Sequence, residues 1–192
     1  MNPVAGSGAV LSKESAAPAG PVTSAPTAPA RALLTPAAAE LLRRMREQHG
    51  PLMLHQSGGC CDGSSPMLYQ AGEFIVGDRD VLLGVLLGTE DGPDRGVPLW
   101  ISGPQFATWR HTQLILDVVP GRGGGFSLEA PEGVRLLTRG RVYQPDELAL
   151  LTTTPPMTGA AVEVAGLPDQ PGPTVVDPAR DARAAAVCPL PG

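Results

Sequence analysis

The spacing of apolar residues along the chain changes its period once, near Gly50. Before this glycine, apolar residues recur at i, i+3, i+4 and i+7 from Ala38 to Met45, with arginines mostly between them. This spacing gives an α-helix one apolar face. Threonine is a common helix cap and proline suits the first helical position, so Thr35-Pro36 marks a start. The pattern predicts an amphipathic helix that ends near Gly50.

Beyond Gly50 the apolar residues come in short runs separated by turns rich in glycine and proline. Runs of this length predict β-strands, and residues 102–109 between two of them predict a short capped helical turn. One helix followed by many short strands predicts an α+β fold dominated by a sheet or sandwich. The predicted strands are Leu52–His55, Met67–Tyr69, Asp80–Leu87, Leu99–Ile101, Gln113–Val119, Phe126–Glu129 and Val134–Thr138.

Both ends of the 192-residue chain differ in composition from its middle. They are rich in alanine, proline and glycine, and they bury too little apolar surface to offset an ordering entropy of about 1–2 kcal/mol per residue. We therefore predict disordered tails at residues 1–32 and, for the most part, at residues 146–192. Residues 33–145 are then expected to form a single β-rich domain.

Charge and hydropathy exclude several classes of protein. The formal charge of −5 is modest and the arginines form no basic stripe, which argues against nucleic-acid binding. No apolar run approaches the roughly 20 residues of a membrane span, and the N-terminus lacks the basic and apolar regions of a secretion signal. We expect a cytoplasmic protein, and its three cysteines do not describe a disulfide scaffold.

The chemistry of the chain is concentrated in the segment Ser57-Gly58-Gly59-Cys60-Cys61-Asp62-Gly63. The glycines allow a tight turn that would present both thiols. Adjacent Cα atoms lie about 3.8 Å apart, below the usual disulfide range, so a bond between these cysteines would be strained. As thiolates, Cys60 and Cys61 can instead face one soft metal ion or cluster, with His55 and His111 as further ligands. Packing of both cysteines as small apolar side chains is the structural alternative.

Two other features have structural explanations. Asp117, inside an apolar run, can orient a histidine or pair with an arginine such as Arg110 or Arg122, and the ion pair is the favoured interpretation. The glycine-rich run Gly121–Gly125 lacks the helix and the lysine that a phosphate-binding loop needs.

Several stretches together resemble one bacterial family, domain-of-unknown-function family 779. They are HGPLMLHQSGGCCDGSSPMLY, DVLLG, WRHTQLILDVVPGRGGGFSLEAPEG and RLLTRGRVY, within Thr35 to Tyr143. This resemblance implies no settled activity. The genes of the family often lie beside aldehyde dehydrogenase genes, which implies an aldehyde dehydrogenase as a partner.

A more distant resemblance is to HesB-like domains, the A-type iron–sulfur carriers. The order LTPAAAELLRRM, a strand and SGGCCDG is similar to the helix, strand and Gly-Gly-Cys-Ser-Gly turn that open those domains. The resemblance implies a HesB-like sheet and a cluster-ligating role for Cys60, with Cys61 in place of the serine. The C-terminal Cys-Gly-Cys of that family is missing, and Cys188 lies far away in the tail.

The leading hypothesis is an accessory protein rather than an enzyme. It would bind a soft metal ion, or an iron–sulfur cluster shared across a homodimer, through Cys60 and Cys61, and it would serve an aldehyde dehydrogenase. One alternative is a vicinal-thiol enzyme or aldehyde sensor in which Cys60 forms an adduct. The other is an interaction module whose Cys-Cys turn is structural.

Overall fold

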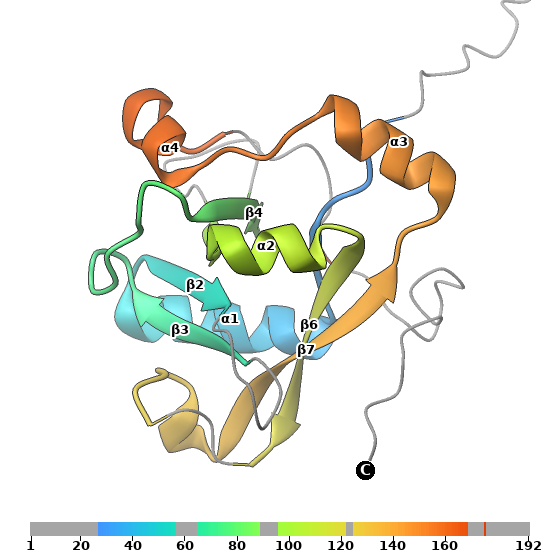
Figure 1. Ribbon diagram of the computed structural model, residues 1–192. Coiled ribbons are helices and arrows are strands. Elements are labelled where there is room, and N and C mark those ends of the chain that lie inside the picture. The colour runs from blue at the N-terminus through green and yellow to red at the C-terminus, as the bar shows by residue number, and fades with distance from the viewer. Residues whose placement is uncertain (1–26, 57–64, 89–95, 122–124, 169–174, 176–192) are drawn as a thin grey trace, which may run out of the picture.

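The computed structural model describes residues 27–56, 65–88, 96–121, 125–168 and 175, and its helices and strands confirm the α+β class (Figure 1). None of the helices among these residues is long and apolar enough to cross a membrane. The elements are, in chain order, β1 (Ala32–Leu34), α1 (Pro36–His49), β2 (Leu52–Gln56), β3 (Pro66–Gln70), β4 (Val81–Leu86), β5 (Val97–Ile101), α2 (Gly103–Trp109), β6 (Thr112–Pro120), the 3-10 turn η1 (Ala130–Glu132), β7 (Val134–Val142), α3 (Pro145–Thr153) and α4 (Gly159–Ala165).

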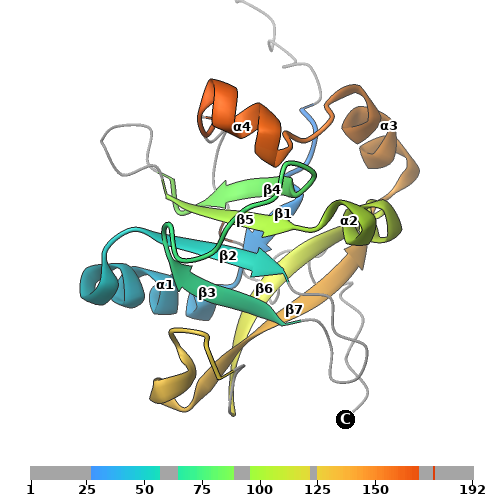
Figure 2. The same ribbon diagram turned by 60° about the vertical axis from the view of Figure 1, so that its left-hand side comes forward.

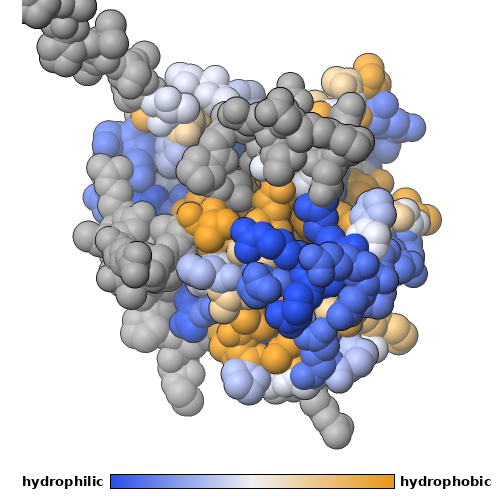
Figure 3. Space-filling view, turned by 180° about the vertical axis from the view of Figure 1, so that it is seen from behind, coloured by the Kyte–Doolittle hydropathy of each residue, from blue (hydrophilic) through white to orange (hydrophobic). Residues whose placement is uncertain are grey.

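The predicted helix is confirmed as α1, and its ends have the expected caps. The Thr35 hydroxyl accepts a hydrogen bond from the backbone N–H of Ala38 at 3.2 Å, and Gly50 ends the helix with a φ of 79°. The predicted apolar stripe from Ala38 to Met45 is buried. The opposite face carries exposed arginines, and strongly hydrophilic residues gather on this side of the molecule (Figure 3).

The described strands form two sheets. Sheet A has the order β1-β6-β7, with β1 parallel to β6 and β7 antiparallel to it. Sheet B has the order β3-β2-β5-β4, with β2 parallel to β5 and antiparallel pairs on either side. Helix α1 contacts β1 and β6 of sheet A as well as β2 of sheet B. The main core therefore lies between the two sheets and α1.

Sheet B is covered on its second face as well. There Met53, Leu82, Val85 and Trp100 form a separate apolar cluster. Partly buried side chains from β3, from the segment after it and from the C-terminal segment cover this cluster: Tyr69, Phe74, Val76, Met157, Val162 and Leu167. Figure 2 shows α4 beside β4, and α1 on the side of β2 and β3. Sheet B is consequently the middle layer of the molecule.

Helices continue beyond the predicted domain boundary at residue 145, into the first half of the segment predicted as a mostly disordered tail. Helix α3 is tied to sheet A by a buried ion pair, in which Arg141 donates to both carboxylate oxygens of Glu147 at 2.8 and 2.9 Å. The segment before α4 runs along β4, where the Leu82 N–H donates to the Met157 carbonyl at 2.9 Å. Order at the other end begins before residue 33, since β1 starts at Ala32. Residues 1–26, 169–174 and 176–192 lie outside the described part.

The predicted strand Phe126–Glu129 is wrong, since no strand forms at these residues. These residues form a turn, with Phe126 exposed and Ser127 and Glu129 buried. The Ser127 hydroxyl donates to the Glu129 carboxylate and accepts from the Leu68 backbone N–H at 2.9 Å. The alternation of the sequence resembles that of a strand, but its two polar side chains are buried: Ser127 bonds β3, and Glu129 accepts from the backbone N–H of Leu136 in β7.

The packing of α4 gives a first prediction. A Cβ on Gly159 would overlap the backbone carbonyl oxygen of Gly77, which belongs to the turn before β4. We expect Gly159→Ala to lower the free energy of unfolding by about 1–3 kcal/mol in denaturant titrations. Gly84→Ala is the matched control, since a Cβ there meets nothing within 4 Å, and it should be neutral or stabilising. Equal effects of the two changes would show that the α4 segment does not pack on this turn.

Candidate functional site

The hairpin formed by β2 and β3 brackets the Cys-Cys segment. The two strands pair from Leu52↔Gln70 to Gln56↔Pro66, so Gln56 and Pro66 fix the base from which the connecting residues leave. Cys60 and Cys61 themselves lie outside the described residues. Gln56 is fully buried, and its amide oxygen accepts a hydrogen bond from the Thr138 hydroxyl of β7 at 2.5 Å. The base of the hairpin is therefore attached to sheet A.

A pocket of about 370 Å³ opens on the same part of β7. His111, which lies between α2 and β6, is exposed and contributes to its wall. The pocket is lined by Thr108 and Trp109 of α2, His111, Thr112 and Leu114 of β6, and Thr138 and Gly140 of β7. Because Thr138 both lines this pocket and bonds Gln56, His111 belongs to the same region as the base of the Cys-Cys segment.

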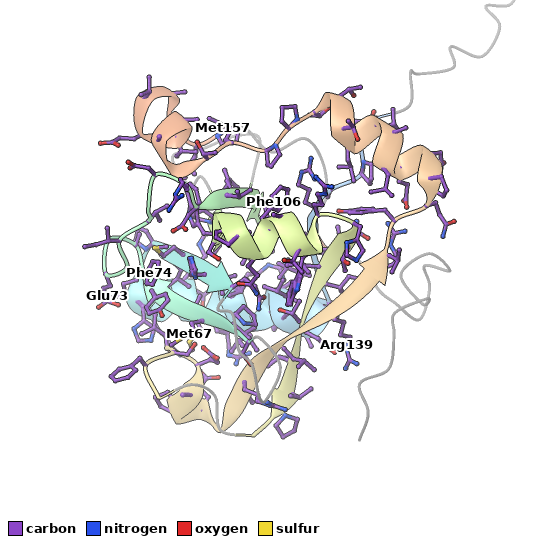
Figure 4. The ribbon with its side chains drawn as sticks, viewed as in Figure 1. Met67, Glu73, Phe74, Phe106, Arg139 and Met157 are labelled. Atoms are coloured by element: carbon purple, nitrogen blue, oxygen red, sulfur yellow. The ribbon has the colours of Figure 1, made fainter. Side chains whose placement is uncertain are left out.

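His55 faces away from this pocket, because neighbouring residues of a strand point to opposite faces. Its partner in β5 is Trp100, which belongs to the cluster on the second face of sheet B. The ring of His55 lies against that of Phe74, with centres 4.5 Å apart; Phe74 is labelled in Figure 4. The two predicted histidine ligands, His55 and His111, thus lie on opposite sides of sheet B.

The surroundings of His55 favour its neutral form. Burial lowers the pKa of the imidazole, and the carboxylate of Asp80 opposes that shift only in part. The Nε2 atom lies 3.6 Å from Oδ2 of Asp80, which is too long for a hydrogen bond. Nε2 is buried without any other partner among the described residues. The described surroundings of His55 are thus an aromatic ring and one carboxylate neighbour.

Asp117 forms an ion pair, as expected, but with a different arginine. Its carboxylate accepts from Arg139 at 2.8 Å and from the Thr35 hydroxyl at 2.9 Å; Arg139 is labelled on β7 in Figure 4. Arg110 is exposed, and Arg122 lies outside the described residues. Asp117 therefore joins the start of α1 to β6 and β7.

Sequence reasoning missed the rest of the pocket, since threonine, tryptophan and glycine carry no specific chemical signal. One sign was available in β7, where alternation places Leu136, Thr138 and Gly140 on one face. A hydroxyl and a glycine where apolar side chains are expected indicate a hollow lined by polar groups. Within the described ranges, no group of three or more His, Cys, Asp or Glu side chains is arranged to hold a metal ion.

Comparison with known proteins identifies a family. Residues 41–142 match the model of a family described as Domain of unknown function (DUF779). No curated protein and no solved structure matches the chain. The predicted resemblance to family 779 is confirmed, while the HesB-like resemblance stays a prediction.

The lowered pKa of His55 predicts how stability depends on pH. The folded state favours the neutral ring, so its contribution is complete above the unfolded pKa of about 6.5 and is lost as pH falls through the lowered folded value. Between pH 7.5 and 5.5, the wild type should lose more unfolding free energy than His55→Gln in denaturant titrations. Asp80→Asn should increase this loss of unfolding free energy, because the carboxylate charge that raises the pKa of His55 is then absent. Parallel pH curves for wild type and His55→Gln would contradict the assignment.

Proposed function

This chain belongs to the DUF779 family, whose description names no activity, and we propose from its own residues that it binds a soft metal ion through Cys60, Cys61 and His111. The protein would act as an accessory protein that holds the ion rather than as an enzyme. The aldehyde dehydrogenase partner expected from the family resemblance stays a prediction.

One observation supports this choice of ligands. The Thr138 hydroxyl bonds Gln56 at the start of the Cys-Cys segment and lines the same pocket as His111. Cys60 follows Gln56 by four residues, and an extended chain spans at most about 3.6 Å per residue. The covalent chain therefore keeps the Cα atoms of Cys60 and Cys61 within about 14 and 18 Å of the Cα atom of Gln56, whose side chain contacts the Thr138 hydroxyl in the wall of the His111 pocket.

The types of ligand indicate the kind of ion. Two thiolates and an imidazole suit soft or borderline ions such as Zn²⁺ or Cu⁺, whereas Mg²⁺ and Ca²⁺ prefer carboxylates and carbonyl oxygens. No carboxylate is found among the described residues of the pocket lining. Three protein ligands leave one position of a tetrahedral ion for a small molecule or for a partner. His55 is left out of the proposed set because it faces the other side of sheet B.

The test is metal content in the full-length protein purified without a metal-binding tag. Wild type should carry a stoichiometric soft metal by elemental analysis, and Cys60→Ser with Cys61→Ser should lose it while keeping the wild-type thermal midpoint. His111→Gln should weaken metal affinity by about tenfold or more, as measured by competition with a chelator.

Matched controls separate ligation from general effects of the substitutions. Cys188→Ser and His49→Gln should leave metal content unchanged, because neither residue belongs to the proposed set. A double serine variant that binds as much metal as wild type would overturn the proposal. An intense visible absorption band together with iron would instead indicate a cluster, and would replace the single ion by a cluster shared between copies.

A further inference from the structure

We infer that the pocket beside Trp109 is a binding site for a small uncharged organic molecule that carries a hydroxyl or carbonyl oxygen. Its volume of about 370 Å³ falls within the range of ligand-binding pockets. A second hollow, which shares Trp109, Thr112 and Leu114 with this pocket, holds about 10 Å³, which is room for no more than a water molecule. Of these two hollows, the larger can therefore accept an organic ligand.

Side chains that can donate hydrogen bonds line this pocket without described partners. They are those of Trp109, His111 and Thr112, and none of these side chains bonds to another described residue. The hydroxyls of Thr108 and Thr138 do donate, to the Pro104 carbonyl and to Gln56 respectively, but both keep lone pairs. An oxygen that accepts hydrogen bonds would satisfy the unpaired donors.

The lining also sets the charge of the ligand. Among the described residues that line it there is no carboxylate, guanidinium or amine, and the imidazole of His111 is the one ionisable side chain of this set. A charged ligand would lose water of hydration there without gaining a compensating partner among these residues, which disfavours its binding. The indole of Trp109 and the side chain of Leu114 offer an apolar surface for the body of the molecule. An uncharged molecule with one oxygen and a flat or aliphatic body fits these features.

Glycine at position 140 keeps the pocket open. Gly140 lies opposite Leu114 in the β6–β7 register, and a Cβ there would lie 2.9 Å from Cγ2 of Thr112. Any larger residue would fill the space or displace the Thr112 side chain. The cavity thus depends on one particular residue. The residues that carry the inference are all described ones, and it stands whether or not Cys60 and Cys61 bind metal.

The two tryptophans of the chain make a direct test possible. Trp109 lines the pocket, whereas Trp100 is buried in the cluster on the far face of sheet B, so its indole signal is an internal control. We expect benzyl alcohol, titrated into ¹⁵N-labelled metal-free protein, to shift the Trp109 indole signal saturably and to leave the Trp100 signal in place. Benzoate and benzylamine, of the same shape but charged, should bind at least tenfold more weakly. Trp109→Phe assigns the two signals.

Variants connect the signal to the pocket. Thr112→Val should weaken benzyl alcohol binding about three- to tenfold, the effect of one neutral hydrogen bond, and the exposed Thr152→Val should not. Gly140→Ala should abolish binding, and an unmoved Trp100 signal would show that this variant is folded. The double serine variant of Cys60 and Cys61 should bind as wild type does, which separates this test from that of the metal. Absence of a saturable Trp109 shift, equal shifts of both indoles, or equal binding of the charged probes would overturn the inference.

Discussion

The need to cover sheet B on both faces determines most of this structure. Its two neighbouring strands β4 and β5 are apolar almost throughout, and nearly all their residues are buried. A sheet of this kind needs a layer on each side, as do the parallel sheets of α/β proteins. Sheet A and α1 supply one layer, and the segment from Met157 to Leu167 supplies much of the other. The C-terminal helices therefore belong to the fold, and β2 carries His55 and Gln56 to different layers.

Sequence patterns predicted the elements whose signals are local. The stripe from Ala38 to Met45, the Thr35 cap and Gly50 were sufficient for α1, and apolar runs located strands β2 to β7. The missed elements depend on distant contacts. β1 has only three residues and exists because it pairs with β6, and α4 has the composition of a tail but packs its Val162 on the far face of sheet B. Tertiary contacts of this kind are invisible to local pattern.

The candidate site could be predicted only in part, for a related reason. Reactive side chains stand out in a sequence, so Cys60, Cys61, His55 and His111 were found by residue type alone. Whether they meet depends on strand faces and register, and the pleat of β2 separates His55 from the His111 pocket. The pocket itself is made largely of threonine, tryptophan and glycine, whose significance comes from the space that they enclose. The pairing of β6 with β7 must be known before the cavity between these residues can be predicted.

The attachment of Arg31 affects the order in which the protein can fold during synthesis. Arg31 donates to the carbonyl oxygens of Leu151 and Thr154, the second of which lies 123 positions later in the chain. The strand that follows it, β1, pairs with β6 and so cannot form until residues 112–120 have been made. The first strand of the molecule is therefore among the last to be placed, and a ribosome must complete α3 before the structure closes. Contacts over such distances slow folding, because a long loop must be ordered before they can form.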